Sequence, residues 1–255
     1  MVSKKIYVTK GEKKMNVYVN EITGTADAIT TMYFSRGTWT RELEMDIRDT
    51  CNRVLDRTGS VYEDLDATDS EKFNEWIRKL MKYGVHHTTM LRYIDFSITV
   101  EGLHRAGQDD WDSHAARFNN RIIRSSSRMQ NLELELSDWY KDKAIPTEIA
   151  LEKAGLINKP QTLELDGKEY VSVPNGYVLK EYENNKDVKR GLYPLGFPSN
   201  FIFKVNLTEF AHVYKQRNGR SGANPEVKLL CETICDELEY MNPWISRDLL
   251  SRIEN

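Results

Sequence analysis

Residues 201–217, FIFKVNLTEFAHVYKQR, contain the change of hydrophobic period that decides the fold. Phe201, Phe203 and Val205 recur at every second position, which is typical of a strand with one buried face. Over 207–214 the apolar residues recur at helical spacing instead. Asn206 stands between the two patterns as a helix N-cap, with Glu209 at the capping-box position. The sequence therefore predicts a strand that passes directly into a helix.

A second alternating segment, IDFSITV at residues 94–100, predicts another half-buried strand that ends at Gly102. Short alternating segments around Gly11 predict an N-terminal hairpin of residues 5–9 and 15–20. Residues 26–34 fit either a helix or a strand.

Helical spacing recurs in three further segments, which are residues 39–57, residues 70–84 with Ser70 as N-cap and Gly84 as C-terminal stop, and a final helix from Pro225 to Met241 before Pro243. The expected buried face of the first consists of Leu43, Met45, Ile47, Val54 and Leu55. Together these segments predict an α/β (α+β) fold: one domain, residues 1–255, with a mixed or antiparallel sheet flanked by helices.

Four arginines follow one another at spacings of 4, 3 and 4 in residues 100–129, VEGLHRAGQDDWDSHAARFNNRIIRSSSRM: Arg117, Arg121, Arg124 and Arg128. In a helix they would form one stripe, in which like charges repel. A phosphate against the stripe would remove that repulsion, because guanidinium groups match phosphate oxygens. The alternative is a solvated basic face balanced by Asp109, Asp110 and Asp112, and charge alone does not decide between the two.

The formal net charge of −3 gives no support for general binding to nucleic acid or to a membrane surface, so a basic site must be local. Three cysteines argue against a disulfide framework and suit a reducing compartment. Cys231 and Cys235 could share a helix face, and without nearby partners they predict core packing and no metal site. No apolar run approaches the roughly 18 residues of a membrane span, so we expect a cytoplasmic protein.

His86 and His87 come directly after the helix of residues 70–84. Successive side chains of a strand point to opposite faces, so two adjacent histidines in a strand cannot both contact the same ligand. They therefore indicate either a loop beside a ligand or a surface turn.

The order of these segments resembles the flavin-dependent thymidylate synthases (ThyX). The resemblance rests on a helix that ends in Gly-x-His-His-x-Thr, on IDFSITVEG followed by Arg105, on Ser-x-Arg within SSSRM, on KRGLYPLGFPSNFIFKVNLTEFAHVYKQR, and on ANPEVKLLCETICDEL. It covers roughly residues 70–140 and 188–245. Residues 141–187 have no counterpart. They include two turn signals, Asp166-Gly167 and Pro174-Asn175-Gly176, and predict a hairpin-containing surface insertion.

The resemblance implies roles for individual residues. Ser126, Arg128, Arg190 and Arg217 match positions that contact dUMP or lie beside it, and we add Arg124, which stands where the signature has Glu. His87, Thr89 and Asn206 match positions on the FAD side, and His212 falls where the family often has Asn. Ala116-Arg117-Phe118 stands in place of the family's Arg-His-Arg, and Met129 replaces its Tyr. A different gap placement brings His114, Arg117 or Arg121 into the flavin roles.

The family's enzymes are homotetramers with active sites shared between subunits. In them FAD is reduced by NADPH, methylenetetrahydrofolate supplies the carbon, and reduced flavin mediates transfer to C5 of dUMP. The resemblance implies this activity, with no protein nucleophile and no metal.

Alternatives are a different uridylate C5 modification such as hydroxymethylation, or a non-catalytic nucleotide-binding paralogue. A nucleic-acid-binding protein that stacks bases on Trp111 and Phe118 is disfavoured by the net charge.

Overall fold

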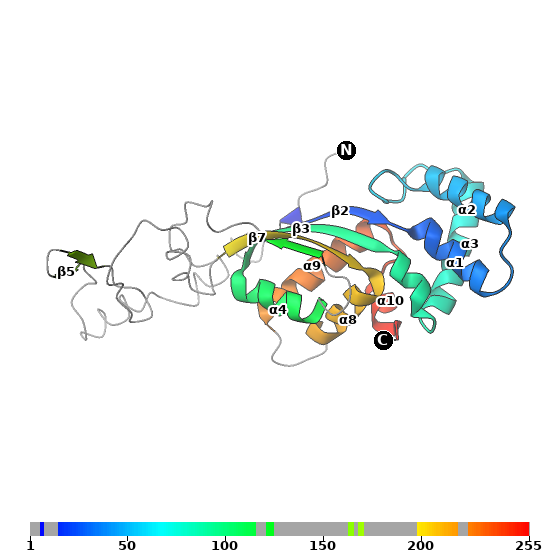
Figure 1. The fold of residues 1–255 in the computed structure, drawn as a ribbon. Coiled ribbons are helices and arrows are strands. Elements are labelled where there is room, and N and C mark those ends of the chain that lie inside the picture. Colours follow the sequence, from blue (N-terminus) through cyan, green and yellow to red (C-terminus); the bar gives the residue numbers. More distant parts are fainter. Residues whose placement is uncertain are drawn as a thin grey trace.

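The computed structural model describes residues 6–7, 15–115, 121–124, 163–165, 168–170, 198–218 and 224–254. Its centre is a five-stranded antiparallel sheet of order β1-β2-β3-β7-β4 (Figure 1). The strands are β1 (Ile6–Tyr7), β2 (Asn16–Thr23), β3 (Asp95–His104), β4 (Arg121–Arg124) and β7 (Pro198–Asn206). The predicted N-terminal hairpin and the predicted antiparallel sheet are both confirmed.

The helices of the described residues are α1 (Thr25–Ser35), α2 (Arg41–Val54), α3 (Ala67–Gly84), α4 (Arg105–Ala115), α8 (Leu207–Asn218), α9 (Pro225–Met241) and α10 (Arg247–Arg252), with a 3-10 helix η1 (Thr88–Tyr93). Helices α4, α8, α9 and α10 lie on one face of the sheet, and α1, α2 and α3 gather at one end of it (Figure 1). The segment 26–34, which fitted either state, is helical in α1. Helix α10 was not predicted.

The pairing of β3 with β7 explains why one face of the sheet carries the core. Phe96 lies opposite Val205, and Ile98 lies opposite Phe203. All four side chains are buried beneath the helices, and the residues between them point to the other face. The alternation in the sequence is thus the signature of a sheet covered by helices on one side.

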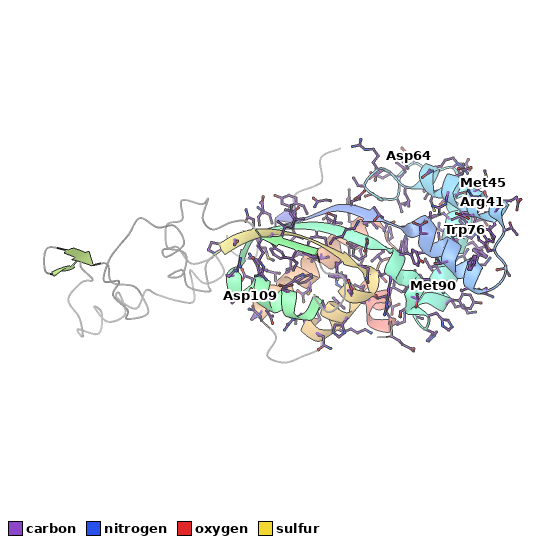
Figure 2. The ribbon with its side chains drawn as sticks, viewed as in Figure 1. Arg41, Met45, Asp64, Trp76, Met90 and Asp109 are labelled. Carbon is purple, nitrogen blue, oxygen red and sulfur yellow. The ribbon has the colours of Figure 1, made fainter. Side chains whose placement is uncertain are left out.

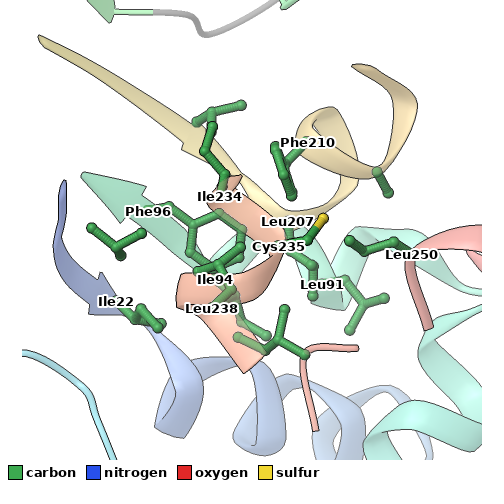
Figure 3. Close-up of a cluster of buried hydrophobic side chains, with 14 of the residues drawn as sticks. Ile22, Leu91, Ile94, Phe96, Leu207, Phe210, Ile234, Cys235, Leu238 and Leu250 are labelled. Atoms are coloured by element: carbon green, nitrogen blue, oxygen red, sulfur yellow. The ribbon is translucent and has the colours of Figure 1, made fainter. Parts of the chain in front are cut away.

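Helix α9 fills the centre of that core. Its buried face includes Ile234, Cys235 and Leu238, which meet Phe96 from β3 and Phe210 from α8 (Figure 3).

The two cysteines of α9 are free and fully buried, and burial raises the pKa of the Cys235 thiol to about 12. Among the described residues no His, Cys, Asp or Glu side chains group as metal ligands. The core role predicted for Cys231 and Cys235 is confirmed.

Gly102 does not end β3 as predicted, because the strand continues to His104. The register shifts between Val100 and Leu103, and Gly102 has a φ of 85° at this irregularity. A glycine adopts that left-handed conformation without the Cβ penalty that other residues incur. Its N–H donates to Oδ1 of Asn200, so the strand bends here and continues.

Two further expectations about helices were wrong. Helix α3 begins three residues before Ser70, because the Asp66 carboxylate accepts hydrogen bonds from the backbone N–H groups of Thr68 and Asp69. Met45 is 55 % exposed and does not belong to the buried face of α2. Figure 2 shows it near Arg41 at the outer end of the helical group.

The helical stripe of four arginines is contradicted by β4. Residues 121–124 form an edge strand in which Ile122 lies opposite Phe203 of β7 and packs against the core. Backbone hydrogen bonds to β7 and the burial of Ile122 decide the local structure here, and arginine spacing does not. A strand has a period of two residues, so the helical spacing that would align the arginines does not apply to residues 121–124. Arg117 and Arg128 lie outside the described residues.

Within the predicted insertion the structure describes one hairpin, of β5 (Leu163–Leu165) and β6 (Lys168–Tyr170). The two strands are antiparallel and are joined across Asp166-Gly167, as that turn signal predicts. The rest of residues 141–187, the second turn signal included, lies outside the described residues.

Gly24, at the start of α1, gives a test of the fold. Its φ is 83°, and a Cβ there would lie 1.8 Å from the carbonyl oxygen of Tyr93. We expect Gly24→Ala to lower the free energy of unfolding by about 3 kcal/mol or more, since strain and a backbone clash add together. Gly37 is the matched control, with a φ of 68° and nothing within 4 Å of the added Cβ.

Gly37→Ala should cost only the conformational strain, about 1 kcal/mol. Urea unfolding followed by circular dichroism measures both variants. Equal losses in the two would contradict the close approach of the chain at Gly24.

Candidate functional site

Helix α4 carries three aspartates that hold arginines from two other elements. Arg124 reaches it from β4: Nη1 donates to Oδ1 of Asp109 at 2.7 Å, and Nη2 donates to Oδ2 of Asp112 at 3.0 Å. Asp109 and Asp112 are three residues apart and therefore lie on the same side of the helix. This pair of contacts is partly exposed, so solvent screens it.

Arg217 reaches the same helix from the end of α8. Its Nη2 donates to Oδ1 of Asp110 at 2.7 Å and to the Asp110 backbone oxygen at 3.3 Å. The Arg217 side chain is only 9 % exposed, so this is a buried cation with a carboxylate partner. Its Nε is also buried and has no hydrogen-bond partner within the described part of the chain.

Helix α4 is fixed firmly enough to serve as a support for these charges. Gln108 donates from Nε2 to the backbone oxygens of both Leu103 and Ser199, at 3.0 Å each, and so ties α4 to β3 and β7. Trp111 is fully buried with its ring 4.8 Å from that of Phe203. The indole is therefore part of the core and is not exposed for stacking on a nucleic-acid base, as the nucleic-acid-binding alternative required.

A second buried polar group joins the end of β3 to the start of α9. The His104 ring accepts the N–H of Gly107 on Nδ1 at 2.7 Å, and its Nε2 lies 2.7 Å from Oε2 of Glu226. Asn224, which caps α9, lies 3.3 Å from the same Nε2. Burial lowers the pKa of His104, although Asn224 and the charge of Asp110 act the other way. Because Nδ1 accepts the N–H of Gly107, the ring proton that faces Glu226 is on Nε2.

The residues predicted for the flavin side lie elsewhere. His87 is the N-cap residue of η1 and Thr89 lies in its first turn; both are exposed. Asn206 is buried, and its Oδ1 accepts from the N–H of Glu209 at 3.0 Å and from the Thr208 hydroxyl at 2.7 Å. The capping box is thus confirmed, and this oxygen is committed to the helix start. His212 lies half-buried in the middle of α8.

The structure therefore separates the predicted residues into two groups. Arg124 and Arg217 meet at α4, whereas Asn206 lies at the other end of α8, roughly 16 Å away at about 1.5 Å per helical residue. Asp109 of α4 and Met90 of η1 lie at opposite ends of the sheet (Figure 2). Among the described residues, one subunit does not bring Arg217 and Asn206 together.

Several predicted site residues lie outside the described residues: Ser126, Arg128, Arg190 and Arg117. Arg121 lies in β4, but its side chain is not described.

The contacts of Asp110, His104 and Glu226 were not predicted from the sequence. The three aspartates of α4 were visible as counter-charges, but nothing in the sequence shows which arginine each would meet. No sequence pattern indicated that His104 and Glu226 are in contact, since they are neighbours only in the folded chain.

Comparison with known families now identifies the chain. Residues 44–244 match the family described as thymidylate synthase complementing protein. The chain belongs to this family. No curated protein matches its sequence significantly. The family match over residues 44–244 covers well over half of the chain and confirms the family that the sequence motifs indicated.

Solved structures share the fold of this family member at low identity. The flavin-dependent thymidylate synthase ThyX from Helicobacter pylori, complexed with FAD and dUMP, is 15 % identical with a TM-score of 0.52, and 92 % of this chain and 99 % of that one are covered. A second structure of that enzyme with FAD and dUMP is 16 % identical, with a TM-score of 0.52 and coverage of 93 % and 100 %.

The UMP/dUMP methylase PolB from Streptomyces cacaoi, bound with 5-Br dUMP, is 10 % identical with a TM-score of 0.53, and 92 % and 93 % of the two chains are covered. The predicted fold class is confirmed.

Proposed function

We propose that this protein is a flavin-dependent thymidylate synthase-like enzyme, which transfers a one-carbon unit to C5 of dUMP. Methylenetetrahydrofolate would supply the carbon and NADPH the electrons, and the enzyme would work in the cytoplasm. Family membership supports the reaction class, and relatives of the same fold bind dUMP or 5-Br dUMP. The observation in this chain that carries the proposal is Arg217, a buried arginine at the expected nucleotide position.

Arg217 and Arg124 would bind the nucleotide, together with Ser126, Arg128 and Arg190 from outside the described residues. Guanidinium groups donate parallel hydrogen bonds to phosphate oxygens, and they also polarise carbonyl oxygens. Negative charge develops on the uracil ring when C5 reacts, and fixed donors stabilise it more than mobile ones because they need no reorganisation. Arginines already held by α4 are fixed in this sense.

The residues described on the flavin side fit FAD in part. His87 and Thr89 are exposed and make no side-chain hydrogen bond within the described residues, so both can donate to the cofactor. Oδ1 of Asn206 is occupied by the helix cap, so any contact from this residue would use its amide nitrogen. His212, Arg117 and Arg121 remain proposed ligands. When bound, reduced FAD would supply the reducing equivalents of the transfer.

A homotetramer with shared active sites would resolve the separation of the two groups. Arg217 and Asn206 lie at opposite ends of α8, so a single subunit offers nucleotide donors at one end and flavin donors at the other. If each active site takes its groups from neighbouring subunits, the two ends complement each other.

Flavin absorbance tests the cofactor. We expect the purified protein to carry FAD or to bind added FAD with the visible bands of an oxidised flavin, because His87 and Thr89 are available to it. His87→Ala should reduce FAD binding, whereas His86→Ala serves as the control, since His86 is paired with Glu254. A folded protein without any FAD binding by absorbance or calorimetry would contradict the flavoenzyme and favour the non-catalytic paralogue.

Calorimetry with dUMP tests the arginine. We expect Arg217→Ala to weaken dUMP binding by about 1.5–3 kcal/mol, the range for hydrogen bonds to charged groups. Arg217→Lys should restore only part of the lost dUMP affinity, since an ammonium group cannot reproduce the paired donors of a guanidinium. Arg57→Ala, an exposed arginine after α2, is the control and should change little.

Unchanged dUMP affinity in Arg217→Ala would refute the nucleotide site. Tight binding of a single-stranded DNA oligonucleotide without binding of dUMP would favour the nucleic-acid alternative.

Light scattering tests the assembly. We expect a homotetramer at micromolar concentration, because the two groups of donors need a second subunit to meet. A monomer that persists with FAD and dUMP would rule out the shared site.

The mass of the product distinguishes methylation from hydroxymethylation at C5. Mass spectrometry of a turnover mixture with dUMP, NADPH and methylenetetrahydrofolate should show the mass of a methylated nucleotide. An added oxygen would instead indicate hydroxymethylation.

A further inference from the structure

The contact between Asp110 and Arg217 differs from the other ion pairs of α4. Arg124 is shared by two partly exposed aspartates, whereas Arg217 is buried and meets Asp110 alone among the described carboxylates. Asp110 contacts one nitrogen, Nη2, through both its carboxylate and its backbone oxygen. These two contacts, together with burial, restrict the orientation of the Arg217 guanidinium plane.

The anchor behind this contact is rigid. Asp110 lies between Gln108, whose amide is bonded to β3 and β7, and Trp111, which is packed in the core. Arg217 itself stands in the last turn of α8. A carboxylate on a fixed helix can therefore set the position of a guanidinium on another element. The bond engages Nη2 only, and Nε remains without a partner in the described chain.

We propose that Asp110 is a positioning residue for nucleotide binding: it holds the Arg217 guanidinium in the orientation that receives dUMP. This inference rests on the proposed function of the site. Asp110 acts through Arg217 and does not itself touch the nucleotide, since a carboxylate repels a phosphate. Its charge also compensates the buried cation while the site is empty of ligand.

A double-mutant cycle on dUMP affinity tests the role of Asp110. Asp110→Asn keeps the shape and one acceptor oxygen but removes the charge that fixes the guanidinium. We expect it to weaken dUMP binding roughly 10-fold in the otherwise unchanged chain. In the Arg217→Ala background the same substitution should change affinity less than about 2-fold, because residues that act as a unit are not additive.

Two further variants separate positioning from stability. Asp110→Glu keeps a carboxylate on α4 and should bind dUMP within about 3-fold of the unchanged protein, as rescue by a charged replacement predicts. Asp69→Asn is the matched control: Asp69 binds Arg53 at 2.6 and 2.8 Å, but both lie in the helical group away from α4. It should leave dUMP affinity unchanged. Circular dichroism on each variant confirms that the chain is folded.

The outcomes distinguish this inference from the function on which it rests. Equal weakening by Asp110→Asn in both backgrounds would show a merely structural residue, and unchanged or tighter binding would show that Asp110 does not orient Arg217. Either result overturns the positioning role and leaves the enzyme proposal standing. If the unchanged protein binds no dUMP at all, the proposed function and the positioning role both fall.

Discussion

The antiparallel pairing of β3 with β7 is the constraint on which the arrangement of this protein depends. It places Asn206 beside Asp95 at one end of the pair and His104 beside Pro198 at the other. Helix α8 begins at the first end and α4 at the second, since each follows its strand without a loop. Helix α8 then runs back along the sheet, and its last turn arrives at α4. The meeting of Arg217 with Asp110 is a consequence of this pairing.

Burial makes that meeting energetically significant. Exposed ion pairs contribute about 0–1 kcal/mol, and those of Arg124 with α4 are of this kind. A buried arginine is different, because loss of its partner leaves an uncompensated charge inside the protein at a cost of about 3–5 kcal/mol. Helix α4 therefore has two tasks: Trp111 and Gln108 fasten it to the sheet, and Asp110 compensates a cation from another helix.

This arrangement relates the stability of the fold to its proposed chemistry. Arg124 and Arg217, two of the arginines proposed to bind dUMP, are already held by α4, so a nucleotide would not have to order them. His87 and Thr89, which are proposed for the flavin side, are exposed at the start of η1. The contact of Arg217 with α4 and the exposed residues His87 and Thr89 therefore lie in different parts of the subunit.

The sequence by itself determined several features that depend on neighbours along the chain. The alternation of β3 and β7, the apolar face of α9 and the capping box of Asn206 with Glu209 all involve residues a few positions apart, and each was predicted. The order of motifs also indicated the family.

Only the tertiary structure decided which charges meet. Arg217 and Asp110 are far apart in the sequence, as are His104 and Glu226, and no local pattern records such pairs. The same reason made residues 121–124 a strand despite their helical arginine spacing, because hydrogen bonds from β7 outweighed a local preference. Local periodicity sets the elements, whereas the pairing of distant strands sets their partners.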